Sequence, residues 1–263
     1  MHIAVCVKQV PDTTDVRIDP ATNTLVRSGV ASILNPFDAY AVEEGVRLRE
    51  AQGGDSKVTV LSMGPPQAEA MLRECLSVGA DEAVLLSDRA FAGADTWATS
   101  WALALALGKL KADLVICGKQ AIDGDTAQVG PGIARHLDWP QACYVSKVAE
   151  LVSGRIVVEC LLEAGREVLE VQLPAVLTVV KDVNIPRLPS LKGKMRAKKA
   201  EITIWKAADI GADPADVGLN GSPTVVARTF SPPGRSGGEI ISGDSAPEKA
   251  RKLVARLREA QVI

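Results

Sequence analysis

Short apolar runs alternate with helix-length amphipathic segments over the first half of the chain. The runs rich in Val, Ile and Leu predict strands, and the longer segments between them predict helices. The expected strands cover Ile3 to Val7, Val58 to Ser62, Ala83 to Leu86 and Leu114 to Cys117, and the expected helices cover Asp38 to Gln52, Gln67 to Val78 and Thr96 to Leu110. Because these strands lack a polar face, helices must cover both faces of the sheet. The pattern predicts an α/β fold with a doubly wound, mainly parallel sheet up to about residue 145.

A turn-rich insertion interrupts this alternation between Pro11 and Pro36. Two short apolar runs, Val16 to Ile18 and Thr24 to Val26, flank the stretch DPATN. Asp, Pro and Asn favour tight turns. We therefore expect a small β-hairpin after the first strand.

From about Ser146 the chain predicts strands without helices between them. The alternation of apolar and polar residues from Val168 to Leu173 is typical of an antiparallel strand with one wetter face. We expect this antiparallel section to extend the same core. Its strands cover Val148 to Leu151, Arg155 to Leu162, Val168 to Leu173 and Val176 to Val180.

After Asp182 the composition becomes typical of a linker. Two prolines lie between Ile185 and Ser190, a basic run covers Lys192 to Lys199, and a Gly/Pro/Ser-rich stretch covers Pro232 to Gly243. We expect an extended arm with little core of its own. The expected domains are an α/β unit at residues 1–184 and an arm with a terminal helix at residues 185–263.

The terminal helix is predicted by an apolar stripe with Lys, Arg and Glu opposite it. Such a helix can pack on its own sheet or embrace another subunit, and we favour the partner. The stripe consists of Ala246, Ala250, Leu253, Val254 and Leu257.

Composition excludes several classes of protein. Hydrophobic residues make up 47% and charged residues 24%, as in globular domains. The net charge of −2 gives no overall attraction for nucleic acid or an anionic membrane. The basic run from Arg187 to Lys199 lacks interleaved aromatics, so nucleic-acid binding is not expected.

The chain also lacks the signals of export and of membrane insertion. Its first residues read as a strand rather than a signal peptide, and its longest uncharged stretch, Thr96 to Gly108, is too short to span a bilayer. Five scattered cysteines without a CxxC pair suit a reducing compartment, and two histidines make a multi-histidine metal site improbable. We expect a cytoplasmic protein.

The most informative stretch is GKQAIDGDTAQVGP, from Gly118 to Pro131, which lies between a strand and a helix expected at Gln128 to Leu137. Unsatisfied N–H groups at a helix start bind phosphate. The closely spaced Gly124, Gly130 and Gly132 would let a ligand approach the backbone. Helix capping by Asp125 or Thr126 is the competing interpretation.

Two further clusters are expected at the same edge of the sheet. Asn35 to Asp38, NPFD, opens the first long helix, where Asn35 or Asp38 can cap and Pro36 suits the first turn. Ser62 and Met63 end the second strand, where they offer backbone donors to a nucleotide or form a plain turn into the next helix. No GxGxxG, P-loop or catalytic Ser/His/Asp or Cys/His set is present, so no catalytic residue is nominated.

With these motifs the chain resembles the β subunit of electron transfer flavoproteins over essentially its whole length. The resemblance rests on VKQVPD, NPFDAYAVEEGVRLRE, GKQAIDGDTAQVGP, LPAVLTV, NIPRLPSLKGKMRAKKAEI and the terminal helix. It implies a heterodimer with an α subunit that holds a redox FAD. It also implies that this chain holds an adenine nucleotide in a fold related to adenine nucleotide α-hydrolases.

The nucleotide depends on the branch of the family. The loop Asp123 to Pro131 and the segment Gly218 to Pro233 are similar to the electron-bifurcating branch. That similarity implies a second FAD that accepts hydride from NADH. Its electrons then pass to the α-subunit FAD, which serves an acyl-CoA dehydrogenase or quinone oxidoreductase, and to ferredoxin or flavodoxin. Small side chains at Gly124 and Ala127 leave room for the larger cofactor.

The resemblance also implies particular residues. Leu191 matches an exposed leucine that docks onto acyl-CoA dehydrogenases, although its competing interpretation is packing within the arm. The expected nucleotide ligands, mostly acting through backbone groups, are Val7, Asn35, Asp38, Ser62, Met63, Gly118, Asp123, Asp125, Thr126, Gln128, Val129 and Gly130.

Two alternatives remain open at this point. A non-bifurcating β subunit would hold structural AMP in the same place and carry no redox cofactor of its own. A stand-alone nucleotide hydrolase or stress protein would use the same sheet, but it would need catalytic residues that the chain does not offer.

Overall fold

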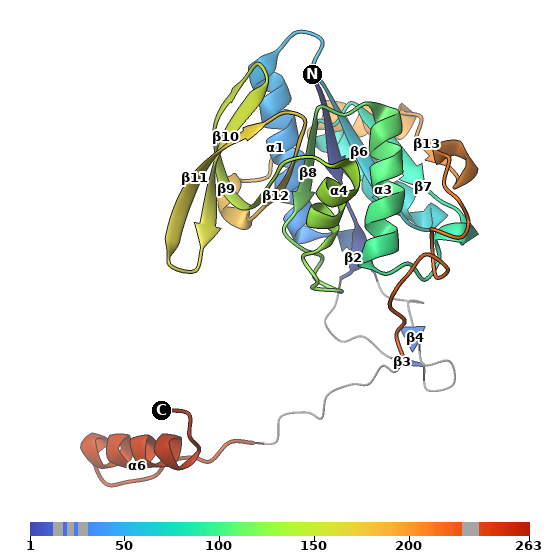
Figure 1. Cartoon of the computed structure of the whole chain (residues 1–263). Helices are drawn as coiled ribbons and strands as arrows, with labels where there is room; N and C mark the ends of the chain where they lie inside the picture. Colours follow the sequence, from blue (N-terminus) through green and yellow to red (C-terminus); the bar gives the residue numbers. More distant parts are fainter. Residues whose placement is uncertain (13–17, 20–23, 26–30, 228–236) are drawn as a thin grey trace.

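A mixed sheet of nine strands organises the part of the chain that the computed structural model describes, residues 1–12, 18–19, 24–25, 31–227 and 237–263. The strand order is β11-β10-β9-β12-β8-β1-β6-β7-β13 (Figure 1). The parallel strands are β1 (His2–Cys6), β6 (Lys57–Met63), β7 (Glu82–Leu86), β8 (Leu114–Gly118), β12 (Ala175–Val179) and β13 (Thr203–Trp205). The expected doubly wound parallel sheet is thereby confirmed.

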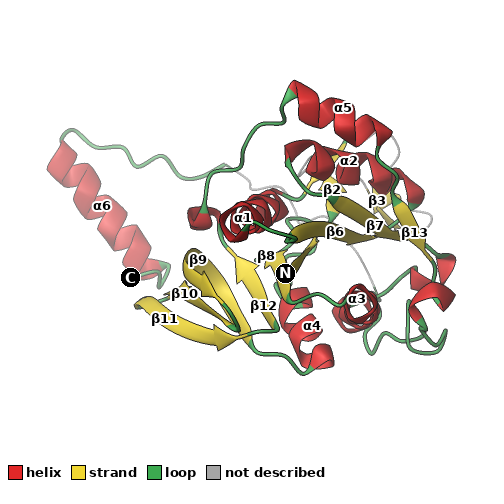
Figure 2. Cartoon of the chain, turned by 90° about the horizontal axis from the view of Figure 1, so that it is seen from above, coloured by secondary structure: helices red, strands yellow, loops and turns green. Residues whose placement is uncertain are grey.

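Helices cover both faces of this sheet, as strands buried on both faces require (Figure 2). On one face lie α1 (Pro36–Gln52), α2 (Glu69–Val78) and α5 (Leu191–Lys199), and on the other lie α3 (Thr96–Leu110) and α4 (Val129–Leu137). Strand β1 shows why: Ile3 and Val5 join the core under α1 and α2, whereas Ala4 and Cys6 join the core under α3 and α4. Short 3-10 helices cover Pro66–Ala68, Arg89–Phe91, Lys181–Val183 and Ala208–Ile210.

The antiparallel section is a meander of β9 (Gln141–Val152), β10 (Arg155–Leu162) and β11 (Gly165–Gln172). It confirms the expected addition to the core. Strand β9 begins earlier than expected because its first residues pair in parallel with β12. Strand β12 also pairs in parallel with β8, so it belongs to the wound sheet rather than to the meander.

The insertion after β1 contains two small antiparallel pairs. β2 (Gln9–Pro11) pairs with β5 (Ser32–Leu34), and β3 (Ile18–Asp19) pairs with β4 (Thr24–Leu25). The second pair confirms the expected hairpin. Its expected ends at Val16 and Val26, and its turn at residues 20–23, lie outside the described residues.

Residues 191–217 depart from the expected extended arm and pack on the α/β domain. Arg73 of α2 donates to the carbonyls of Ala197 and Ala200, and Arg196 of α5 donates to those of Leu76 and Ala80. Strand β13 then pairs with β7, and the chain that follows it buries four side chains in the core, those of Ala207, Ile210, Ala212 and Val217. The expectation of little core is therefore wrong for this part.

The terminal helix α6 (Ala246–Glu259) confirms the prediction from its periodicity. None of its residues is buried, and Leu253 and Val254 of its apolar stripe are 47% and 39% exposed. Figure 1 shows the helix standing clear of the sheet. The apolar stripe is therefore not buried against the described part of the chain.

The close packing of α1 on β1 predicts that alanine substitution at two helical glycines has opposite effects on the free energy of unfolding. A Cβ on Gly45 would lie 2.9 Å from Val5 Cγ2, whereas a Cβ on Gly108 of α3 would meet nothing within 4 Å. We expect Gly45→Ala to lower the free energy of unfolding by about 1–3 kcal/mol. Gly108→Ala should raise it by up to about 1 kcal/mol. Urea unfolding of both variants checks this, and equal effects would contradict the packing of α1 on β1.

Candidate functional site

The candidate site lies where the parallel strands β1, β6 and β8 end at a common edge. Open α/β sheets bind their ligands outside the carboxyl ends of the strands. At this edge Val7 follows β1, Met63 ends β6, and the loop from Gly118 to Gln128 follows β8. The loop leads into α4, and the start of α1 lies against the end of β8.

Asn35 ties the start of α1 to the loop after β8. Its side chain is 1% exposed, its Nδ2 donates to the carbonyl of Gln120 at 2.9 Å, and its Oδ1 accepts from the N–H of Ile122 at 3.2 Å. Asn35 occupies the N-cap position and Pro36 lies in the first turn, as expected, but the side chain makes no capping bond. The amide therefore positions the loop and leaves α1 uncapped by a side chain.

Asp38 connects the ends of β1 and β8. Its buried carboxylate accepts the N–H of Lys8 at 2.7 Å and a backbone hydrogen bond from Gly118. Burial raises the pKa of Asp38 to about 7, against the opposing effect of these donors. A Cβ on Gly118 would overlap this carboxylate and lie 2.7 Å from the carbonyl carbon of Phe37. Only glycine therefore fits at Gly118.

The loop itself holds two residues in the left-handed region. Asp125 and Ala127 have φ angles of 55° and 54°, which cost about 1–3 kcal/mol each for residues other than glycine. Asp125 is held by Gln120, whose side chain contacts its carboxylate, and by its N–H bond to the carbonyl of Ala121 at 2.8 Å. Strain of this kind is typical of ligand-binding loops.

The capping interpretation of Asp125 and Thr126 is wrong. Helix α4 begins at Val129 with Gln128 as its N-cap, and no side chain caps it. Gln128 instead accepts a hydrogen bond from Thr96 at 3.3 Å. The first N–H groups of α4 therefore remain available to an anion.

Packing accounts for two of the three glycines in this region. A Cβ on Gly130 would overlap the methyl group of Thr178, and a Cβ on Gly132 would lie 2.5 Å from Ser100 Oγ. Both glycines let α4 approach its neighbours. Gly124 alone is open, with only Lys8 Nζ near it, at 3.9 Å.

The remaining expected residues lie along the same edge. Val7 and Ser62 are buried and Met63 is half-buried, while Asp123, Asp125, Thr126 and Gln128 are exposed on the loop. The structure thus brings Asn35, Asp38 and Gly118 into contact. Ser62 and Met63 lie on the next strand along.

Sequence reasoning missed Lys8, whose Nζ contacts Asp123 Oδ1 at 2.6 Å. This ion pair joins the end of β1 to the loop and places a cation beside the open Gly124. Its only signal in the sequence is its place in VKQVPD, directly after the first strand.

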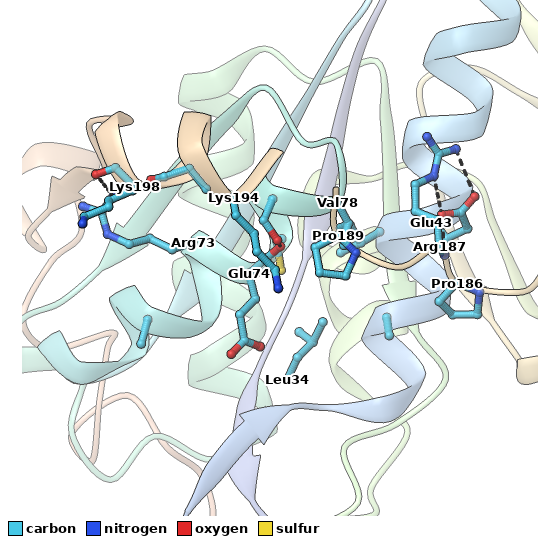
Figure 3. Close-up of a pocket in the computed structure, with 16 residues that line it drawn as sticks. Leu34, Glu43, Arg73, Glu74, Val78, Pro186, Arg187, Pro189, Lys194 and Lys198 are labelled. Atoms are coloured by element: carbon cyan, nitrogen blue, oxygen red, sulfur yellow. Dashed lines mark hydrogen bonds and ion pairs between the residues drawn. The ribbon is translucent and has the colours of Figure 1, made fainter. Parts of the chain in front are cut away.

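A cavity of about 540 Å³ lies elsewhere, between α1, α2 and α5 (Figure 3). Its walls include Leu34, Val42 and Val78, and the segment from Pro186 to Pro189 borders it. It contains none of the expected nucleotide ligands. Because those residues converge on the sheet edge instead, we assign the candidate site to the edge.

The expected docking residue Leu191 starts α5 and is 77% exposed, so it does not pack within the arm. Nearby Ile185 and Leu188 are both 89% exposed. Between them, Arg187 donates to Glu43 at 2.8 Å and to Glu50 at 2.7 Å, which fixes this segment to α1.

Taken with the wound sheet, this edge defines an α/β protein of the kind that binds ligands at the carboxyl ends of its strands. Comparison with known families then matches the electron transfer flavoprotein domain to residues 22–210. The chain belongs to the electron transfer flavoprotein family and resembles its β subunits along its full length.

Three relatives illustrate the similarity. The electron transfer flavoprotein subunit beta of Thermoanaerobacterium thermosaccharolyticum is 54% identical, and subunit CarD of the caffeyl-CoA reductase-Etf complex of Acetobacterium woodii is 53% identical, each with complete coverage of both chains. Protein FixA of Azotobacter vinelandii is 47% identical over 98% of this chain and 94% of its own length. Within the described residues, no helix combines the length and apolar character needed to cross a membrane.

The raised pKa of Asp38 predicts a pH effect. Between about pH 4 and pH 7 the folded protein keeps a proton on Asp38 that the unfolded chain releases, so this group lowers the free energy of unfolding as pH rises. The free energy of unfolding of the native chain should fall relative to that of Asp38→Asn. The difference should shrink by a few kcal/mol across this pH range, at about 1.4 kcal/mol per unit of pKa shift. Urea unfolding at several pH values checks this, and a constant difference would refute it.

The exposed loop predicts a binding defect. Replacing Asp125 and Thr126 together with alanine removes the contact to Gln120 and a hydroxyl beside the start of α4. We expect the affinity of the purified variant heterodimer for its nucleotide to fall about tenfold. This is the effect of losing one or two hydrogen bonds to a charged ligand. Asp138→Ala is the matched control, because Asp138 is also left-handed and flanks α4 at its other end. If the variant binds nucleotide as tightly as the native heterodimer, the loop is not part of the nucleotide site.

Proposed function

We propose that this chain is the β subunit of an electron-bifurcating flavoprotein. Residues at the carboxyl edge of its sheet would hold FAD. When bound, this FAD would supply a hydride acceptor for NADH and a single-electron donor to the FAD of an α subunit, which serves an acyl-CoA dehydrogenase or quinone oxidoreductase, and to ferredoxin or flavodoxin. The observation that carries the proposal is the loop after β8, which Asn35 and Asp38 hold against the uncapped start of α4.

The residues at this edge fit a dinucleotide. The free N–H groups of α4 suit a pyrophosphate, and Lys8 adds a cation beside Gly124. The loop carboxylates would repel phosphate, but Asp123 is paired with Lys8 and Asp125 is bound by Gln120. The site therefore presents backbone donors together with the Lys8–Asp123 ion pair, while Asp125 keeps its charge and is oriented by Gln120.

The contribution of the protein is to position the cofactor. Bound FAD would supply the change between two-electron and one-electron transfer. The buried Asn35 and Asp38 fix the loop, and the exposed Thr126 and Gln128 lie beside the start of α4. No side chain is assigned as a general acid or base.

The partners are proposed from the relatives and from two exposed surfaces. The relatives named as beta subunits support an α-subunit partner, and the relative named for a caffeyl-CoA reductase complex supports a partner that acts on CoA esters. We assign the open stripe of α6 to the α subunit. We assign Leu191, with Ile185 and Leu188, to the dehydrogenase, because exposed apolar anchors dominate transient interfaces.

The nucleotide content of the heterodimer tests this proposal. We would co-express the chain with its α subunit, release the bound nucleotides by heat, and quantify FAD and AMP. The proposal predicts two FAD and no AMP per heterodimer. One FAD with one AMP would instead identify a structural AMP holder without a redox cofactor of its own.

ATP turnover gives a separate test of the remaining alternative. The isolated chain should hydrolyse no ATP above a buffer control, because no catalytic set accompanies the loop. Measurable turnover that persists after repurification would support a stand-alone nucleotide hydrolase.

A further inference from the structure

Tyr144 is the most unusual residue at the carboxyl edge outside the loop. It lies in β9 with a φ of 58°, a left-handed conformation that a bulky aromatic residue rarely adopts. The pairing of β9 with β12 shifts register at this point, between Leu177 and Val179. Irregularities of this kind often turn a side chain toward a functional site.

The surrounding chain holds Tyr144 in this conformation. Its N–H donates to Thr178 Oγ1 at 3.1 Å, and the methyl group of the buried Thr178 faces Gly130 of α4. The strained backbone is thus linked through one side chain to the start of the helix at the candidate site.

The strained backbone of Tyr144 does not bury its side chain. It remains 40% exposed, and Lys119 Nζ lies over its ring at 5.3 Å from the centroid. Lys119 is the second residue of the GKQ loop, and its N–H bonds to the carbonyl of Val179. An exposed aromatic ring and a cation therefore stand beside the loop on the side away from Asp38.

The strand order shows how far Tyr144 and Lys119 lie from the expected ligands on β1 and β6. Val7 follows β1, Ser62 lies one residue before the end of β6, the loop follows β8, and Tyr144 lies beyond β12 on β9. Neighbouring strands lie about 4.8 Å apart, so β6 and β9 are separated by about 19 Å. A dinucleotide spans such a distance with its pyrophosphate in the middle, and a mononucleotide does not.

The geometry points to Tyr144 and Lys119 as the end of the site that receives the flavin ring of a dinucleotide. This inference rests on the FAD proposed above and names the residues that favour FAD over AMP. The Tyr144 ring offers a stacking surface, and Lys119 offers a cation to the polar edge of the flavin. The adenosine end would then lie at the opposite end of this edge, near Val7, Asp38 and Ser62.

Affinities of the heterodimer for FAD and AMP test the inference. Tyr144→Gly removes the ring but accepts the left-handed backbone, so the fold is preserved. We expect its affinity for FAD at the β site, measured by flavin fluorescence, to fall about tenfold, the size of a ring-stacking contact. Its affinity for AMP should not change. Tyr144→Phe should bind FAD as the native protein does.

Lys119→Met should weaken FAD binding severalfold without affecting AMP. Its matched control is Lys109→Met, because Lys109 covers Trp205 in a second cation–π pair at the far side of the sheet. That control should bind both nucleotides normally.

The possible failures are distinguishable. A native heterodimer that binds only AMP would overturn the FAD proposal together with this inference. A native heterodimer that binds FAD, with Tyr144→Gly binding FAD equally well or losing FAD and AMP affinity alike, would overturn the role of Tyr144 alone.

Discussion

A buried polar junction between Asn35, Asp38 and Gly118 determines the shape of the candidate site. These groups join the first turn of α1 to the ends of β1 and β8, and each hydrogen bond is made in a largely dry environment. Low local dielectric strengthens such bonds and makes the loss of any one partner costly. These bonds therefore fix the loop after β8 in the absence of a ligand. The first N–H groups of α4, which follows the loop, have no side-chain cap.

The carboxyl edge of the sheet and one of its faces have different roles in the proposed function. The carboxyl edge carries the candidate site, while the face covered by α1, α2 and α5 (Figure 2) carries the exposed apolar residues around Leu191. Arg187 connects them, because it fixes the Pro186 to Pro189 segment to the same helix α1 that begins at the polar junction. In our account, the partner that docks at Leu191 meets a surface whose position is set by the nucleotide-binding domain.

The sequence predicted the central strands and helices because their hydrophobic pattern is a local property. It also located the candidate site, since the motifs follow strand ends that topology must bring together. It failed where distant contacts decide. Helix α5 looked like a basic linker, but Arg73 and Arg196 bind backbone carbonyls more than 100 positions away. Asn35 looked like a cap, yet its partner Gln120 is 85 positions away. Tyr144 left no signal, because its left-handed backbone is visible only in three dimensions.

A crystal structure of the heterodimer, purified with its own nucleotide, would test the central claim most directly. We expect electron density for phosphate at the start of α4, beside the ends of β8 and β12, and for ring systems toward β6 and β9. Density for the nucleotide in the cavity between α1, α2 and α5, with the carboxyl edge free of ligand, would contradict it.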